Sequence, residues 1–323
     1  MNKIVPIIGF VVLSVMVLLL FGFTTYGAWT SQPVGGVVMT LILLGLLFEI
    51  YREFRELPKV KLNGVFTQKN LFNFLAVLAG ALIACTLNWN VKLGAVVAVG
   101  LVGVVAANVL PDYSVPLYCG AFAGMASQKL LSNHGELAVA GIIAGVAYVL
   151  ALGVFDGFGG KLGTIAFTGC VIAGFSLAGE FAHPAIPAWN VGWLIVVYSV
   201  VAALVTFYIN VYLKRGAVMA SAVVGLVGGL VLPVVHPEIG GTLAGMVICA
   251  SFAGMSSAKR FPNIVPMAIA GLVGGLVFIY SMPHLGGAGG KFGTIAFGSV
   301  MAVRGYLDFI ATLRGTSQPK QPV

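Results

Sequence analysis

Apolar residues occur along this chain in long continuous runs, separated by short stretches that contain Gly, Pro and most of the charged residues. The strands of a membrane barrel alternate apolar and polar positions over ~10 residues, a pattern that these runs do not follow. Runs of ~17–22 residues are long enough for helices that cross a bilayer. About twelve such segments are predicted, near 4–24, 35–51, 71–88, 93–110, 115–129, 137–155, 162–179, 191–212, 216–234, 240–257, 264–281 and 292–312. The short ones, notably 115–129, are candidates for re-entrant or broken helices.

Composition indicates an all-α polytopic membrane protein. Of the 323 residues, 59% are hydrophobic and 8% are charged, and the mean hydropathy is +1.05. A soluble globular chain carries ~25% charged residues, and its core stops growing near ~250–300 residues. Lipid must therefore surround most of the side chains, and backbone groups in lipid have to be paired within helices. The net charge of +8 does not indicate nucleic-acid binding, because the basic residues lie in the gaps between apolar runs.

The distribution of basic residues predicts the orientation in the membrane. Five of them lie in the polar stretch from Tyr51 to Lys69, which the positive-inside tendency places in the cytoplasm. If every later segment crosses, further basic residues also fall inside, namely Lys214-Arg215, Lys259-Arg260, Arg314 and Lys320. Lys92 and Lys129 are the exceptions. We therefore expect a multi-pass protein of a bacterial-type inner membrane, with both termini cytoplasmic.

The first apolar run admits two interpretations. Met1-Asn2-Lys3 followed by apolar residues is typical of a signal peptide, with Tyr26-Gly27-Ala28 as a weak cleavage site. The run continues to about Phe23, however, which is longer than the ~7–15 residues of a signal core. An uncleaved first helix is therefore favoured.

Three blocks of sequence occur twice, in the same order. Gly159-Gly-Lys-Leu-Gly-Thr-Ile-Ala-Phe167 recurs as Gly289-Gly-Lys-Phe-Gly-Thr-Ile-Ala-Phe297, with eight of nine positions identical. Forty residues upstream in both copies, 119–127 (CGAFAGMAS) recurs as 249–257 (CASFAGMSS). Further upstream, 94–111 matches 216–233 at ten of eighteen positions. Three ordered matches indicate an internal duplication.

The duplication predicts two inverted five-segment repeats, preceded by two extra N-terminal helices. An odd number of segments per copy makes the second copy enter the membrane from the opposite side, a plan that many secondary transporters use. The expected divisions are 1–70, with two transmembrane helices and a basic linker, 71–190 as repeat 1, and 191–323 as repeat 2 with a short cytoplasmic tail. The first two helices are expected to have a packing or dimerisation role, and a homo-oligomer is possible.

A lysine in each copy is the strongest candidate for chemistry. Lys161 and Lys291 follow glycine-rich stretches and precede a Gly-Thr that opens an apolar run. A helix that begins there would add free N–H groups and a positive dipole to the ammonium charge, which suits an anion. The predicted site comprises Gly159, Gly160, Lys161, Gly163, Thr164, Gly289, Gly290, Lys291, Gly293 and Thr294. Snorkelling of both lysines to the interface is the alternative, and a nucleotide P-loop does not fit the motif.

The second repeated block is rich in small residues, which is sufficient for close helix packing. The alternative is an unwound stretch in which the backbone and the hydroxyls of Ser127, Ser256 and Ser257 contact the substrate. Four cysteines fall inside apolar runs and are expected to be free thiols rather than disulfides or zinc ligands; they are Cys85, Cys119, Cys170 and Cys249.

Other ionisable residues within or beside the apolar runs are few. His134, His183, His236 and His284 fall on the external side of the predicted topology, near Glu136, Glu180 and Glu238, and are expected to be solvated loop residues rather than metal ligands. Arg304, inside the last run, either neutralises substrate charge or marks the end of the helix. Asp156 is placed to pair with Lys161 or to join a proton relay, and its counterpart is Gly286.

These features favour a secondary transporter or facilitator for a small, anionic solute, without a cofactor or a metal. A channel with the glycine loops as a constriction is the alternative within transport. A membrane enzyme is disfavoured because no cluster of catalytic side chains is evident, and an assembly subunit without a ligand is the third class.

Overall fold

The computed structural model describes residues 4–60 and 67–315, and these residues form helices joined by turns and short loops. Met1-Asn2-Lys3 and Lys320, which entered the predictions of a signal peptide and of the cytoplasmic tail, lie outside the described residues. Twelve α-helices are present in the described part: α1 Ile4–Ser31, α2 Pro33–Glu56, α3 Gln68–Trp89, α4 Ala95–Val109, α5 Ser114–Ala123, α6 His134–Leu150, α7 Lys161–Ser176, α8 Trp189–Phe207, α9 Ala217–Val235, α10 Gly240–Gly254, α11 Ile264–Ser281 and α12 Lys291–Leu313.

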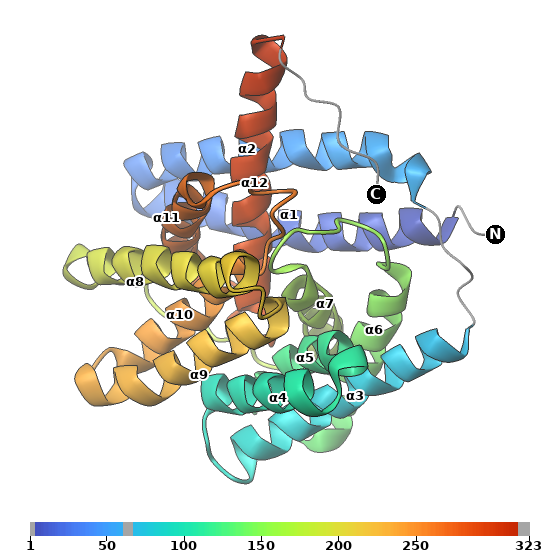
Figure 1. The fold of residues 1–323 in the computed structure, drawn as a ribbon. Coiled ribbons are helices and arrows are strands. Elements are labelled where there is room, and N and C mark those ends of the chain that lie inside the picture. Colours follow the sequence, from blue (N-terminus) through green and yellow to red (C-terminus); the bar gives the residue numbers. More distant parts are fainter. Residues whose placement is uncertain (1–3, 61–66, 316–323) are drawn as a thin grey trace.

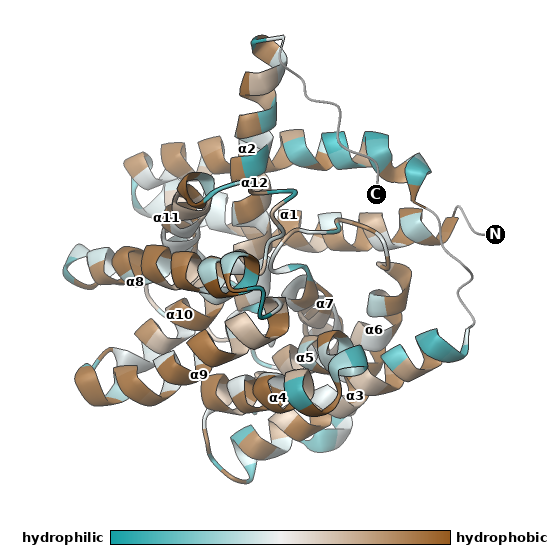
Figure 2. Ribbon diagram, in the orientation of Figure 1, coloured by the Kyte–Doolittle hydropathy of each residue, from teal (hydrophilic) through white to brown (hydrophobic). Residues whose placement is uncertain are grey.

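Seven of the described helices are long and apolar enough to cross a membrane, namely α1, α2, α3, α8, α9, α11 and α12. The prediction of an all-α fold is confirmed, and these seven helices are consistent with the predicted membrane spans. The remaining helices are shorter; α5, with ten residues, extends only ~15 Å at 1.5 Å per residue. In Figure 2 the hydrophobic colour dominates most helices, and the hydrophilic colour gathers at the end of α2, the start of α3 and along the outer part of α12.

Local sequence signals explain where several helices begin. Pro33 opens α2, where its missing N–H costs nothing. Asn133 caps α6 by accepting a hydrogen bond from the Glu136 N–H at 3.0 Å, and Asn263 caps α11 in the same way from Val265. The two asparagines hold corresponding positions in the two copies of the duplicated sequence.

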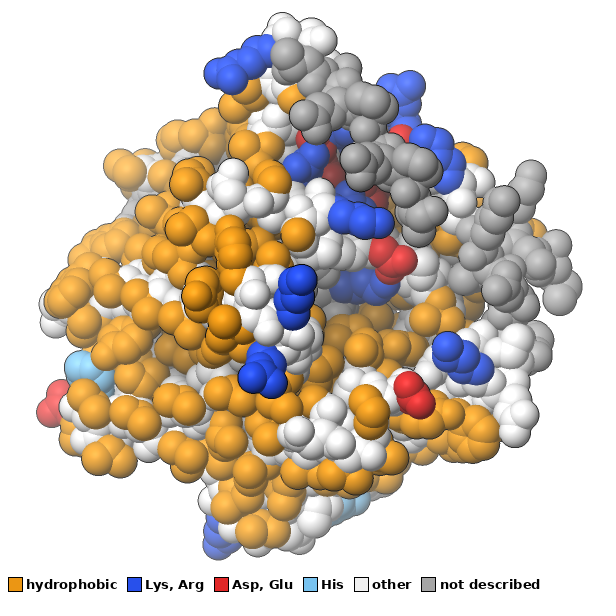
Figure 3. Space-filling view, viewed as in Figure 1, with side chains coloured by type: hydrophobic (Ala, Val, Ile, Leu, Met, Phe, Trp, Pro, Cys, Tyr) orange, Lys and Arg blue, Asp and Glu red, His pale blue; other side chains and the backbone are white. Residues whose placement is uncertain are grey.

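Helices α1 and α2 lie side by side on one flank of the bundle, and α12 crosses them (Figure 1). The crossing of α2 and α12 is close, because a Cβ atom built on Gly305 would lie 2.1 Å from the carbonyl oxygen of Gly45. Beneath them, α3 packs against α5 and α6, as α8 packs against α10 and α11, while α4 lies along α9. Figure 3 shows Lys and Arg at the top, in the centre and on the right of this face, with hydrophobic side chains over much of the rest.

Unusual backbone conformations recur at equivalent positions of the two sequence copies. Lys92 has φ +60° and Lys214 has φ +54°, and each is followed two residues later by a glycine that precedes α4 or α9. Gly160 and Gly290, which precede α7 and α12, both have φ +83°. Conformations of this kind are rare for residues other than glycine, so their recurrence reflects closely similar turns.

Several segments differ from the predicted boundaries or between the two sequence copies; α1, for example, continues to Ser31 instead of ending near 24. Helix α2 continues to Glu56 instead of ending near 51, because Glu49 and Glu53, one turn apart, both face Arg260 of the α10–α11 loop. The predicted segment 115–129 ends as a helix at Ala123. In the second copy Pro233 lies inside α9, whereas its counterpart Pro111 follows α4 and opens a short 3₁₀ turn.

Candidate functional site

Helices α7 and α12 cross at their first turns, through glycines of the repeated motif. A Cβ on Gly163 would lie 2.5 Å from the Gly293 Cα atom, and a Cβ on Gly293 would lie 2.5 Å from the Gly163 Cα atom. A Cβ atom on Gly160 would lie 2.4 Å from the backbone nitrogen of Phe297, and a Cβ atom on Gly290 would lie 2.4 Å from the backbone nitrogen of Phe167. Only glycine fits such an approach, and the positive φ of Gly160 and Gly290 strengthens the requirement. The repeated glycines therefore bring the two copies into backbone contact.

Each glycine loop is also docked on the other copy. The Ser127 N–H donates to the Gly287 carbonyl oxygen at 2.9 Å, and the Ser257 N–H donates to the Gly157 carbonyl oxygen at the same distance. The Gly159 N–H donates to the Ser256 hydroxyl at 3.0 Å, and that hydroxyl donates to the Ala253 carbonyl. The three serines of the predicted site therefore hold the loops in place, and Ser256 is fully buried.

The first lysine of the repeated motif is paired with an acid. The Lys161 Nζ atom lies 3.0 Å from the Asp156 Oδ1 atom, and its side chain is 15% exposed. Of the two roles predicted for Asp156, the structure shows the ion pair with Lys161. Lys161 is therefore a neutralised cation at the end of the α6–α7 loop.

The second lysine has a different environment. Lys291 is 8% exposed, and its Nζ atom donates to the Ser281 carbonyl oxygen at 2.7 Å and more weakly to that of Met282 at 3.4 Å. None of the ion pairs found among the described residues includes Lys291. The carbonyls at the end of α11 supply partial negative charge, but no carboxylate forms an ion pair with Lys291 in the described part of the chain.

A cavity of about 550 Å³ lies beside Lys291. It is lined mainly by the start of α4, the second half of α9, the start of α10, the end of α11, and the 286–290 loop leading into α12. Gly290 and Lys291 line it, whereas Lys161 does not. The structure thus brings the two glycine turns together but directs the two lysines to different surroundings.

The two threonines of the motif are buried at the crossing. The Thr294 hydroxyl donates to the Gly290 carbonyl oxygen at 3.3 Å. The Thr164 hydroxyl has no hydrogen-bond partner in the described part of the chain. Two cysteines of the second repeated block contact the same turns, because Cys119 Sγ donates to the Leu162 carbonyl and Cys249 Sγ to the Phe292 carbonyl. All four cysteines are free and buried, as predicted.

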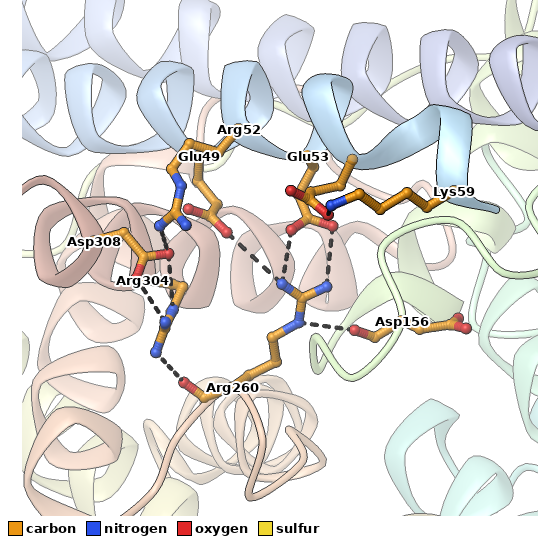
Figure 4. A network of polar contacts seen from close by, with 9 residues as sticks. Glu49, Arg52, Glu53, Lys59, Asp156, Arg260, Arg304 and Asp308 are labelled. Atoms are coloured by element: carbon orange, nitrogen blue, oxygen red, sulfur yellow. Dashed lines mark hydrogen bonds and ion pairs between the residues drawn. The ribbon is translucent and has the colours of Figure 1, made fainter. Parts of the chain in front are cut away.

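A network of charged side chains lies on the Lys161 side of the crossing (Figure 4). Arg260, in the α10–α11 loop, donates from Nη1 and Nη2 to the two Glu53 carboxylate oxygens at 2.7 and 3.0 Å. Its Nε atom donates to the Asp156 carbonyl oxygen at 2.9 Å, and its guanidinium carbon lies 4.0 Å from the centre of the Phe158 ring. Arg260 therefore joins α2 to the loop that carries Lys161.

The network extends along α12. Arg304 donates to the two Asp308 carboxylate oxygens at 3.1 and 2.6 Å and to the Arg260 carbonyl oxygen at 3.0 Å. Arg52 of α2 forms an ion pair with the same Asp308. The charge of Arg304 is therefore balanced by Asp308, a carboxylate of the same network. Sequence reasoning missed Arg260 and Glu53, although the four-residue spacing of Glu49 and Glu53 was a signal for an acidic helix face.

Each of the four histidines of the described chain makes a different contact. His183 Nδ1 lies 2.7 Å from the Pro283 carbonyl oxygen, and His236 Nε2 lies 3.0 Å from the Tyr198 hydroxyl. His134 is in edge contact with Trp89, and His284 stacks on Phe23 of α1. Over the described ranges, no group of three His, Cys, Asp or Glu side chains is arranged to hold a metal ion.

No protein family matches the chain, and no similar curated protein or solved structure was found. Its function must therefore be inferred from the geometry and charges of the site itself.

Proposed function

We propose that this chain is a membrane transporter or facilitator for a small anionic solute, and that the solute binds in the cavity beside Lys291. The observation that carries the proposal is a buried ammonium group at the wall of a 550 Å³ cavity, with two carbonyl oxygens but no carboxylate as partners. Transferring an isolated charge out of water is strongly unfavourable, so buried charges are normally paired. A bound anion would supply the missing negative charge.

The membrane setting of the proposal follows from the helices and the basic residues. Helices α3–α7 form one five-helix repeat and α8–α12 the other, inverted in an inner membrane, with both termini in the cytoplasm. The recurrent turns before α4 and α9 and before α7 and α12 support this arrangement, as do the matching asparagine caps. The charge network then lies on the cytoplasmic side, and the cavity opens toward the external side.

Transport requires access from both sides in turn. The glycine crossing of α7 and α12 separates the cavity from Lys161, and Arg260 bridges the loops on the opposite side. Release to the cytoplasm would require that bridge to open while the cavity side closes. A carrier of this kind saturates and exchanges its substrate, whereas the channel alternative would conduct without exchange.

The proposal is tested with purified protein in liposomes of zwitterionic lipid. Currents on a solid-supported membrane are recorded at pH 6.5 after jumps of chloride, phosphate, succinate and benzenesulfonate, all of which remain ionised. At least one anion is expected to give a current that saturates and that Lys291→Met abolishes, while Lys291→Arg retains part of it. Lys69→Met, which removes an exposed lysine of α3, is the matched control.

Thermal unfolding and size-exclusion profiles establish that each variant is folded. Absence of any protein-dependent current with all four anions would overturn the proposal. A current that Lys291→Met leaves unchanged would remove the assigned site.

A further inference from the structure

The walls of the Lys291 cavity are mostly apolar, and this narrows the class of ligand. We infer that the cavity binds an organic monoanion, a single carboxylate attached to an apolar body, an inference that rests on the proposed function. Large apolar side chains from three helices (α4, α11 and α12) and from the α5–α6 turn line the cavity, among them Val96, Val97, Met125, Phe278, Phe292 and Ile295.

The head of the ligand is fixed by Lys291. Its ammonium has three N–H donors, of which two point to the Ser281 and Met282 carbonyls. The third is left for a ligand oxygen. Thr242, at the start of α10, contributes a hydroxyl-bearing side chain to the cavity wall. A charge-assisted hydrogen bond to a carboxylate is shorter and stronger than one to a neutral acceptor.

A single cation limits the ligand to one negative charge. Lys291 is the one Lys or Arg among the lining residues, and Lys161 is held by Asp156 away from the cavity. Phosphate and dicarboxylates are usually bound by several donors or by the fork of an arginine. A second negative charge in this cavity would face apolar walls without a partner, which is unfavourable.

The body of the ligand is selected by the apolar walls. A small inorganic anion would leave Phe278, Phe292 and Ile295 exposed to water in the cavity, whereas an alkyl or aryl group would cover them. Burial of one methylene group strengthens binding about fourfold. Affinity should therefore rise with chain length until the 550 Å³ are filled.

The test is calorimetric binding to the full chain in nanodiscs of zwitterionic lipid, with empty nanodiscs subtracted for partitioning. Acetate, butyrate and hexanoate form the series, hexanamide is the neutral analogue of hexanoate, and adipate is its dicarboxylate relative. We expect affinity to rise about fourfold per methylene, and hexanoate to bind at least tenfold more tightly than hexanamide or adipate, roughly the worth of a charged hydrogen bond. Lys291→Met should lose this preference for the carboxylate, while Lys69→Met should retain it.

A separate arm replaces part of the lipid with phosphatidylglycerol. Displacement of hexanoate by that lipid would place the source of the bound anion in the membrane, and unchanged binding would place it in water. Equal affinity for acetate and hexanoate, tighter binding of adipate, or no binding of any member would each overturn the inference. If anion currents were seen without binding of the carboxylate series, the transport proposal would stand and this ligand class would be ruled out. If the carboxylates bound but no currents were seen, the ligand class would stand and the transport proposal would be ruled out.

Discussion

The contact between Gly163 and Gly293 makes a sharp prediction about stability. In Gly293→Ala the new Cβ atom would lie 2.5 Å from the Gly163 Cα atom and 3.0 Å from the Gly160 carbonyl oxygen. Two carbon atoms in contact without strain are ~3.5–4.0 Å apart. The first turns of α7 and α12 must therefore separate by roughly 1 Å.

The expected cost follows from the atoms involved. All the nearest atoms belong to backbone, which cannot turn aside as a flexible side chain would. Overpacking of this kind costs about 1–3 kcal/mol, while alanine gains at most ~1 kcal/mol over glycine in a helix. Gly293→Ala should therefore lower the free energy of unfolding by roughly 1–2 kcal/mol.

The assay is unfolding of the detergent-solubilised protein in sodium dodecyl sulfate, followed by tryptophan fluorescence. Gly22→Ala is the matched control, because a Cβ on Gly22, also inside a helix, meets nothing within 4 Å. We expect Gly22→Ala to be as stable as the original chain or more so. If Gly293→Ala matched Gly22→Ala, the two helices would not be in backbone contact, and the description of the crossing would be wrong.

Three further predictions concern other parts of the molecule. Arg260→Met should destabilise the protein by about 3 kcal/mol or more, because it leaves the buried Glu53 carboxylate without its bidentate partner; unfolding assays should show a smaller loss when Glu53→Gln is added. Lys92 and Lys214 are both exposed and have similar backbone conformations. Cysteines introduced at these positions in a cysteine-free background should react with an impermeant maleimide from opposite sides of the membrane. Labelling of both from the same side would refute the inverted arrangement. Burial, with the charges of Lys291 and His183, lowers the pKa of His284 below its ordinary 6.5, so the unfolded chain binds the proton more readily and stability should fall as pH drops below 6.5; His284→Gln should flatten this slope in melting curves.

The helices were largely predictable because continuous apolar runs leave few other structures in lipid. All twelve helices fall within or around the predicted segments, and errors are confined to their ends. At α2 the error has a physical cause: Glu49 and Glu53 are charged residues in sequence, but both are buried against basic groups of distant segments. A hydropathy scale places such charged residues outside an apolar segment. Their burial at the end of α2 depends on a partner from a distant part of the sequence.

The candidate site was predicted in part, from residue types at matching positions. The repeated motif pointed to Lys161 and Lys291, and the neighbouring Asp156 indicated that the two would differ. The sequence could not show that Lys291 faces the end of α11, because Ser281 and Met282 contribute backbone oxygens rather than side chains. Nor could it show the cavity, whose walls come from segments far apart in the sequence, between 93 and 295.

The two sequence copies share a backbone plan but differ in charge where they face opposite ends of the bundle. The turn after α10 contains Arg260, which belongs to the charged network. The equivalent position in the turn after α5 is Leu130, which is buried against Gly174 of α7. Both residues donate their N–H to the serine carbonyl three positions earlier, so the turns themselves are alike. Gly174 occupies the position that corresponds to Arg304 in the other copy. The apolar pair Leu130–Gly174 and the pair Arg260–Arg304 therefore pack the same turn in two different ways. Because α2 supplies Glu53 at only one end, ion pairs hold that end and apolar packing holds the other. In the proposed transporter, the two sides would therefore open by breaking different interactions.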